Sequence, residues 1–103
     1  MINILMKSQF VKVVFDVHCQ WSDNPPRYRC YVEDELFAER TWVWQGVYLE
    51  EVFQIQAPPG RYKIRYELLD PEKSQLRLRN GRIEVGSAVL HKGDVLEIIN
   101  ENA

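Results

Sequence analysis

Hydrophobic and polar residues alternate most clearly between residues 61 and 69. The apolar positions of this segment are Tyr62, Ile64, Tyr66 and Leu68, with charged residues between them. A repeat of two is typical of a β-strand with one buried and one exposed face. The preceding Pro58-Pro59-Gly60 predicts a corner, because proline cannot extend a sheet ladder and glycine accepts unusual backbone angles. We therefore predict that residues 61–69 form a central strand.

Tyr62 stands two residues after the glycine of this corner. That position is typical of the corner tyrosine of Greek-key sandwiches, whose hydroxyl bonds back to the backbone. We expect the Tyr62 side chain to enter the core at the start of the strand and to bond a nearby backbone group.

The same alternation recurs between turn-forming residues along the rest of the chain. The further strands that it predicts are 9–19, 28–32, 36–43, 47–56, 75–79, 82–85, 88–91 and 95–99. Asn80-Gly81 predicts a two-residue hairpin, because both positions tolerate positive φ. Glu51 falls on the apolar side of its segment, which predicts a bulge or a strand end there. The fold class predicted is all-β: a single antiparallel β-sandwich of jelly-roll or Greek-key type, with about eight strands.

Length and charge limit the number of domains and the kinds of partner that the chain can have. A chain of 103 residues suffices for one domain, so we assign 1–103 to one sandwich, with 1–8 and 100–103 as frayed ends. The net charge of −2 gives no general attraction to nucleic acid. No apolar run is long enough to span a bilayer, and Lys7 follows the first apolar patch, the reverse of a signal peptide. These features favour a cytoplasmic or virion-associated protein without membrane partners.

The residues for catalysis or metal binding are not arranged in any familiar motif. Cys30 lies on the inner face of its predicted strand, and neither His18 nor His91 has a second ligand at motif spacing. We therefore predict that the protein is not an enzyme and that no metal site exists. Cys19 and Cys30 could face each other across strands, but two cysteines make no disulfide framework, which favours buried free thiols.

Aromatic residues are the first candidates for ligand binding. Trp42 and Trp44 fall on the same side of a predicted strand, about 7 Å apart, and Tyr48 lies on the polar side of the next. Sugar rings stack on exposed aromatic faces, so these three residues are candidates for binding carbohydrate. The alternative is that both tryptophans belong to the core. Trp21 is expected to fold back over the core, with an exposed contact as its alternative.

A basic face is a second candidate. Arg61, Lys63 and Arg65 line one predicted strand, and Arg77 and Arg79 line another. If these strands are neighbours, they form a positive patch able to contact phosphates or acidic sugars. The alternative is an exposed face on which Glu50, Glu67 and Glu84 pair with the cations.

Three segments together resemble the strand order of small calcium-dependent xylan-binding carbohydrate-binding modules. The segments are PPRYRCYVEDELFAERTWV, YLEEVFQIQAPPGRYKIRYELLD and LRLRNGRIEVGS, and the resemblance covers about 60 residues as a pattern. It implies a β-sandwich that binds carbohydrate. The positions that match the family's calcium ligands are Asp70 and Asn80, so calcium is the one cofactor that the resemblance implies.

Two functions remain open. The first is a non-catalytic binding module, with carbohydrate as its ligand. The alternative is a small structural or assembly protein, such as a virion or accessory subunit, that acts through protein–protein contacts. An open sheet edge would favour pairing with another chain, including a second copy of this one.

Overall fold

The computed structural model describes residues 7–69 and 71–101, and within these ranges all regular elements are β-strands. The eight strands are β1 (Gln9–Trp21), β2 (Arg27–Val32), β3 (Glu35–Thr41), β4 (Tyr48–Ala57), β5 (Gly60–Leu68), β6 (Ser74–Val85), β7 (Ala88–His91) and β8 (Val95–Ile98). They form two antiparallel sheets, so the predicted all-β sandwich is confirmed. No helix that could cross a membrane occurs among the described residues. The predicted frayed ends fall largely outside these ranges.

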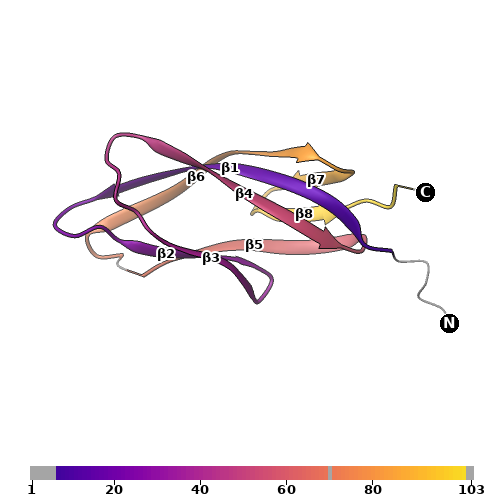
Figure 1. Cartoon of the computed structure of the whole chain (residues 1–103), viewed down its shortest axis with the longest axis horizontal. Coiled ribbons are helices and arrows are strands. Elements are labelled where there is room, and N and C mark those ends of the chain that lie inside the picture. Colours follow the sequence, from indigo (N-terminus) through magenta and orange to yellow (C-terminus); the bar gives the residue numbers. More distant parts are fainter. Residues whose placement is uncertain (1–6, 70, 102–103) are drawn as a thin grey trace.

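The two sheets pack face to face (Figure 1). The smaller sheet has the strand order β4-β1-β6, and the larger has the order β3-β2-β5-β8-β7. Strand β5 therefore lies at the centre of its sheet, as its alternation predicts. Phe37 of β3 and Phe53 of β4 have ring centroids 5.8 Å apart. The edge strands β3 and β4 consequently lie on the same side of the sandwich.

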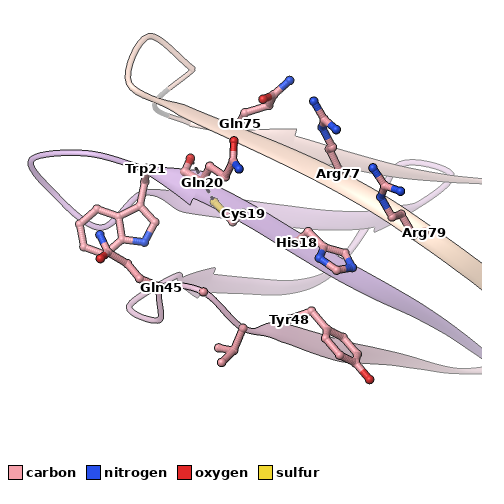
Figure 2. A pocket seen from close by; sticks show the side chains of 11 residues that line it. His18, Cys19, Gln20, Trp21, Gln45, Tyr48, Gln75, Arg77 and Arg79 are labelled. Carbon is pink, nitrogen blue, oxygen red and sulfur yellow. Dashed lines mark hydrogen bonds between the residues drawn. The ribbon is translucent and has the colours of Figure 1, made fainter.

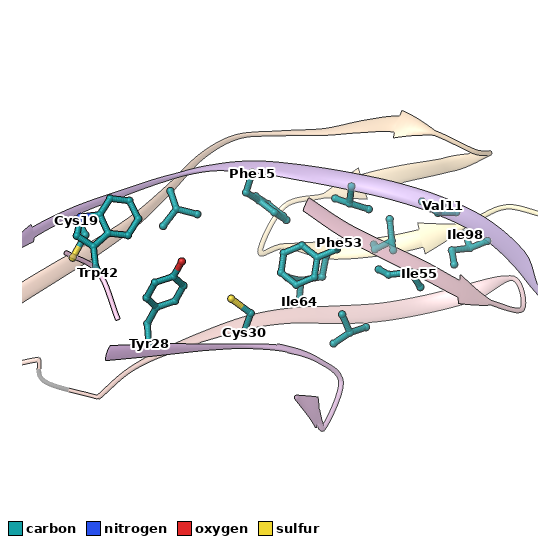
Figure 3. Packing of buried hydrophobic residues seen from close by; sticks show 14 residues of the cluster. Val11, Phe15, Cys19, Tyr28, Cys30, Trp42, Phe53, Ile55, Ile64 and Ile98 are labelled. Carbon is teal, nitrogen blue, oxygen red and sulfur yellow. The ribbon is translucent and has the colours of Figure 1, made fainter. Parts of the chain in front are cut away.

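The core fills the space between the sheets (Figure 3). Phe15 of β1 contacts the edges of Phe53 and Tyr66, with ring centroids 6.1 and 6.4 Å apart. Every second residue of β1 faces this core because its strand alternates, which explains the strong period-two pattern. Cys19 and Cys30 are both buried, free thiols, as the sequence favours.

The hairpin predicted at Asn80-Gly81 is wrong. Residues Ser74–Val85 form the single strand β6, which pairs with β1 on both sides of this dipeptide. The flanking pairs are Asp16 with Arg79 and Val14 with Arg82, so that Phe15 faces two residues. The dipeptide therefore forms a β-bulge, and Asn80 adopts a φ of 53°, which asparagine tolerates better than most residues. Positive φ serves a bulge as well as a hairpin, so the dipeptide alone does not distinguish them.

Close packing explains the glycine of this bulge. A Cβ atom at Gly81 would lie 2.6 Å from Leu90 Cδ2 and 2.7 Å from Phe15 Cε1. Both distances are far below van der Waals contact. The bulge thus brings the β6 backbone directly onto the core.

The bulge or strand end predicted at Glu51 is also wrong. Strands β1 and β4 pair without a register shift from Gln9–Ala57 to His18–Tyr48. Glu51 points into the core and is only 3% exposed. Its carboxylate has partners there: Arg40 Nη2 lies 2.8 Å from Oε2, and the Tyr28 hydroxyl donates to Oε1 at 2.8 Å. Partners from the opposite sheet therefore allow a charged residue to keep an inward position.

Tyr62 behaves as a corner tyrosine. Its hydroxyl donates a hydrogen bond of 2.6 Å to the carbonyl oxygen of Pro58, and its ring packs against the core. Gly60 has a φ of 155°, at the limit of the region that side chains disfavour. The predicted corner is confirmed, and it fixes the register of β5.

Candidate functional site

The predicted platform of two tryptophans is wrong, because Trp42 is fully buried. The Trp42 amide donates to the Pro26 carbonyl at 2.8 Å, which continues the pairing of β3 with β2 past Thr41 and keeps Trp42 on the inward side shared with Arg40. Trp44 is 42% exposed, but its ring meets that of Trp42 edge to face at 5.3 Å. The two rings therefore present no common flat surface.

Trp21 combines both roles that the sequence leaves open. Its ring packs against the core, as expected for a lid, and it also lines a surface groove. Its indole Nε1 donates a 2.9 Å hydrogen bond to the carbonyl oxygen of Trp44. This bond fixes the segment that leads into β4.

The groove lies where β1 and β6 continue past the start of β4 (Figure 2). Strand β4 begins at Tyr48, opposite His18, whereas β1 runs on to Trp21 with only β6 beside it. The preceding residues leave the sheet, and Gly46 takes a φ of 75° in that turn. A groove of about 600 Å³ remains, within the size range of ligand sites. Its lining comprises His18, Cys19, Gln20, Trp21, Gln45, Gly46, Val47, Tyr48, Gln75, Arg77 and Arg79.

Strand pairing places the groove's side chains in a row across the sheet. His18 of β1 pairs with Tyr48 of β4 on one side and with Arg77 of β6 on the other. The rings of His18 and Tyr48 are stacked, with centroids 5.3 Å apart and planes 20° from parallel. Tyr48 is 52% exposed, so the stacked pair is accessible from solvent. Of the three residues predicted to bind carbohydrate, Tyr48 lines the groove, whereas Trp42 and Trp44 are not part of its lining.

Three glutamines supply hydrogen-bonding groups around these rings. Gln20 and Gln75 are paired across β1 and β6, and Gln45 lies in the turn before β4. Each amide carries both donors and an acceptor, which matches the hydroxyl groups of a sugar. Cys19 also lines the groove, but burial raises the pKa of its thiol and so disfavours the nucleophilic thiolate.

The groove is positively charged within a slightly acidic protein. Arg77 and Arg79 extend side by side from β6, beside His18, and no carboxylate is among the described residues of the lining (Figure 2). Among the described residues, every other arginine contacts a carboxylate or an aromatic ring, whereas Arg77 and Arg79 contact neither. Their guanidinium groups are thus available to a ligand.

The acidic neighbours of the groove are already bound by another arginine. Arg82 reaches across β1, donating to Asp16 Oδ1 at 3.0 Å and to Glu50 Oε2 at 3.1 Å. Asn80 donates to Asp16 Oδ2 at 3.1 Å, and this hydrogen bond, with help from Arg82, lowers the pKa of Asp16. Val14, which pairs with Arg82 across the two strands, faces the same outer side and is nevertheless fully buried. Neither carboxylate is therefore free to pair with Arg77 or Arg79.

The basic face predicted from two neighbouring strands is wrong. Strands β5 and β6 belong to different sheets, so their cations do not merge. On β5, Arg61 lies 3.5 Å from Glu97, and Arg65 stacks on the Tyr31 ring at 4.0 Å. The outer face of the larger sheet is largely self-paired, in line with the alternative drawn from the sequence.

The calcium ligands implied by the resemblance do not form a site among the described residues. Asp70 lies outside those residues, and the Asn80 amide is bonded to Asp16. No group of three or more histidine, cysteine, aspartate or glutamate side chains in the described part of the chain could hold a metal ion.

Sequence reasoning identified some residues of the groove but missed the groove itself. The sequence places no second ligand near His18, and the glutamines form no motif because each lies in a different segment. The alternation of β1 continues to Trp21, and extending that strand past residue 19 would have placed His18 and Gln20 on one face. Comparisons with protein-family models, with curated proteins and with solved structures find no match for this chain.

Proposed function

We infer that this protein is a non-catalytic module that binds a glycan in the groove at the end of the smaller sheet. The observation that carries this proposal is the stacked pair of His18 and Tyr48 inside a groove lined by glutamine amides. The solvent-accessible stacked pair suits the C–H side of a sugar ring, and the amides suit its hydroxyls. The raised pKa of Cys19 supports a binding role over nucleophilic catalysis.

A glycan array, screened with calcium and with a chelator, tests this function. We expect binding to at least one glycan, weakened about fivefold to tenfold by Tyr48→Ala because one ring contact is lost. Phe10→Ala is the matched control, since Phe10 is an exposed aromatic residue of β1 outside the groove lining. If no glycan binds in either condition, the proposal fails.

Self-assembly is the second candidate, and the arrangement of the sheet edges favours it. Strands β3 and β4 are edge strands on the same side of the sandwich, and Leu36, Phe37 and Val52 are exposed on them. An exposed strand edge can pair with a second copy of the chain. Light scattering on the wild type and on Val52→Lys tests this candidate. A monomer at every concentration would count against self-assembly.

A further inference from the structure

We propose that the ligand of this groove is an acidic glycan, whose oxyanion groups are bound by Arg77 and Arg79. This inference rests on the proposed function and specifies its ligand class. The oxyanions are carboxylate or sulfate groups attached to the sugar rings, and both offer the same chemistry to a guanidinium group.

The unpaired state of the two arginines is the first argument. A guanidinium group presents a rigid fork of donors that matches the two oxygens of a carboxylate, and such charge-assisted bonds are stronger than neutral ones. The other described arginines already contact a carboxylate or, in the case of Arg65, stack on an aromatic ring. Arg77 and Arg79 are both exposed and do not. Their partner is therefore expected from outside the chain.

Their placement is the second argument. The two arginines stand two positions apart on the same face of β6, about 7 Å from each other. Arg77 is directly opposite His18, whose ring stacks on Tyr48. A sugar ring held against His18 would thus lie beside β6, where its acidic substituent can meet the guanidinium groups. A ligand that contacts the rings and the cations together needs both an apolar ring face and a negative charge, and an acidic sugar carries both.

The contacts of Arg82 with Asp16 and Glu50 are the third argument. Asp16 pairs in register with Arg79 and would otherwise be its nearest carboxylate. Its two oxygens instead accept hydrogen bonds from Asn80 and Arg82. Among the described residues Arg79 is left without an anion, and the net charge of the chain is −2, so the positive groove is a local feature of this site.

Biolayer interferometry with immobilised polymers, at about 0.15 M salt to screen weak surface charge, tests the proposal. The polymers are dextran, dextran sulfate, polygalacturonate and a single-stranded DNA of similar length. The protein variants are Arg77→Gln with Arg79→Gln, and the control Arg61→Gln with Arg65→Gln. Both double variants change the net charge equally, but the control alters the outer face of the larger sheet.

We expect polygalacturonate or dextran sulfate to bind about tenfold or more tightly than dextran, as charge-assisted hydrogen bonds would give. The Arg77/Arg79 variant should lose this preference, and the Arg61/Arg65 variant should keep it. The polymer that binds identifies carboxylate or sulfate as the anion. Circular dichroism melts should be unchanged for the Arg77/Arg79 variant, because neither side chain has a partner within the described chain.

Other results would overturn the proposal in distinguishable ways. If dextran binds equally well, Tyr48→Ala weakens it and the Arg77/Arg79 variant does not, then glycan binding stands and the acidic ligand is wrong. If no array glycan and no glycan polymer binds, both proposals fail. DNA binding of equal strength, or equal losses in both double variants, would show a general attraction to polyanions instead of an acidic-glycan site.

Discussion

Glu51 of β4 and Arg40 of β3 form a salt bridge between the edge strands of the two sheets. The carboxylate is buried, and the Arg40 side chain is 46% exposed, with its Nη2 2.8 Å from Glu51 Oε2. The hydroxyl of Tyr28 completes the shell of the carboxylate from β2. This salt bridge therefore connects the two sheets at their exposed edge strands, β3 and β4.

Replacing Arg40 by alanine should destabilise the fold strongly. The change leaves the Glu51 carboxylate buried without its cation, which we expect to cost about 2–4 kcal/mol of unfolding free energy. Urea denaturation measures this loss. Lys12→Ala is the control, because Lys12 forms a 3.5 Å pair with Glu84 on the protein surface and should cost less than about 0.5 kcal/mol. Equal losses in the two variants would contradict the structural role given to the Glu51–Arg40 pair.

Gly81→Ala tests the bulge in β6. The new methyl group would overlap side chains of Leu90 and Phe15, so we expect a loss of about 1–3 kcal/mol in thermal or urea unfolding. If Gly81 were instead the exposed tip of a hairpin, alanine would meet open space. A fully stable Gly81→Ala variant would therefore speak for the hairpin over the bulge.

Three substitutions test the register of β5. Tyr62→Phe removes the hydrogen bond to Pro58 and should cost about 1 kcal/mol. Tyr62→Ala also removes packing from a half-buried ring and should cost about 2–4 kcal/mol. Arg61→Ala, which faces outward, should change stability by less than about 0.5 kcal/mol. Urea melts that rank Arg61→Ala as the most damaging would mean that the inside and outside of β5 are exchanged.

The two cysteines should be unreactive in the folded protein. Burial, reinforced by the neighbouring Glu51 carboxylate, raises the pKa of Cys30 to about 12, and burial also raises that of Cys19. Since the thiolate is the reactive form, Ellman's reagent at about pH 8 should detect almost no thiol in the native chain. In urea it should detect both. A thiol that reacts rapidly without denaturant would be inconsistent with this packing, and Cys19→Ser would show which residue is responsible.

The sequence predicts the sandwich well because burial of one strand face leaves a period of two. Residues 61–69 and 9–19 show this directly, and the corner at Tyr62 is set by adjacent residues. The failures concern residues whose environment comes from distant segments. Glu51 is tolerated inside because Arg40 and Tyr28 reach it from the other sheet, and nothing near it in sequence indicates this.

The groove was harder to predict than the fold for a related reason. Tyr48, His18 and Arg77 belong to three strands, and only the order β4-β1-β6 puts them in one row. Sheet order is not encoded in local alternation. The inward position of Trp42 also depends on sheet pairing, because Trp42 follows the inward-facing Arg40 in the register of β3 with β2.

The bulge at Asn80-Gly81 also affects the charge beside the groove. Because side chains alternate along a strand, the extra residue lets Arg79 and Arg82, three positions apart, face the same way. Arg82 is then able to pair with both Asp16 and Glu50, while Arg79, among the described residues, stays unpaired beside the groove. If these residues paired with β1 without the bulge, Arg82 would lie opposite Val13 and point toward the core, leaving Asp16 and Glu50 without it next to Arg77 and Arg79. Their negative charge would then offset the positive charge of the groove, although none of its lining residues had changed.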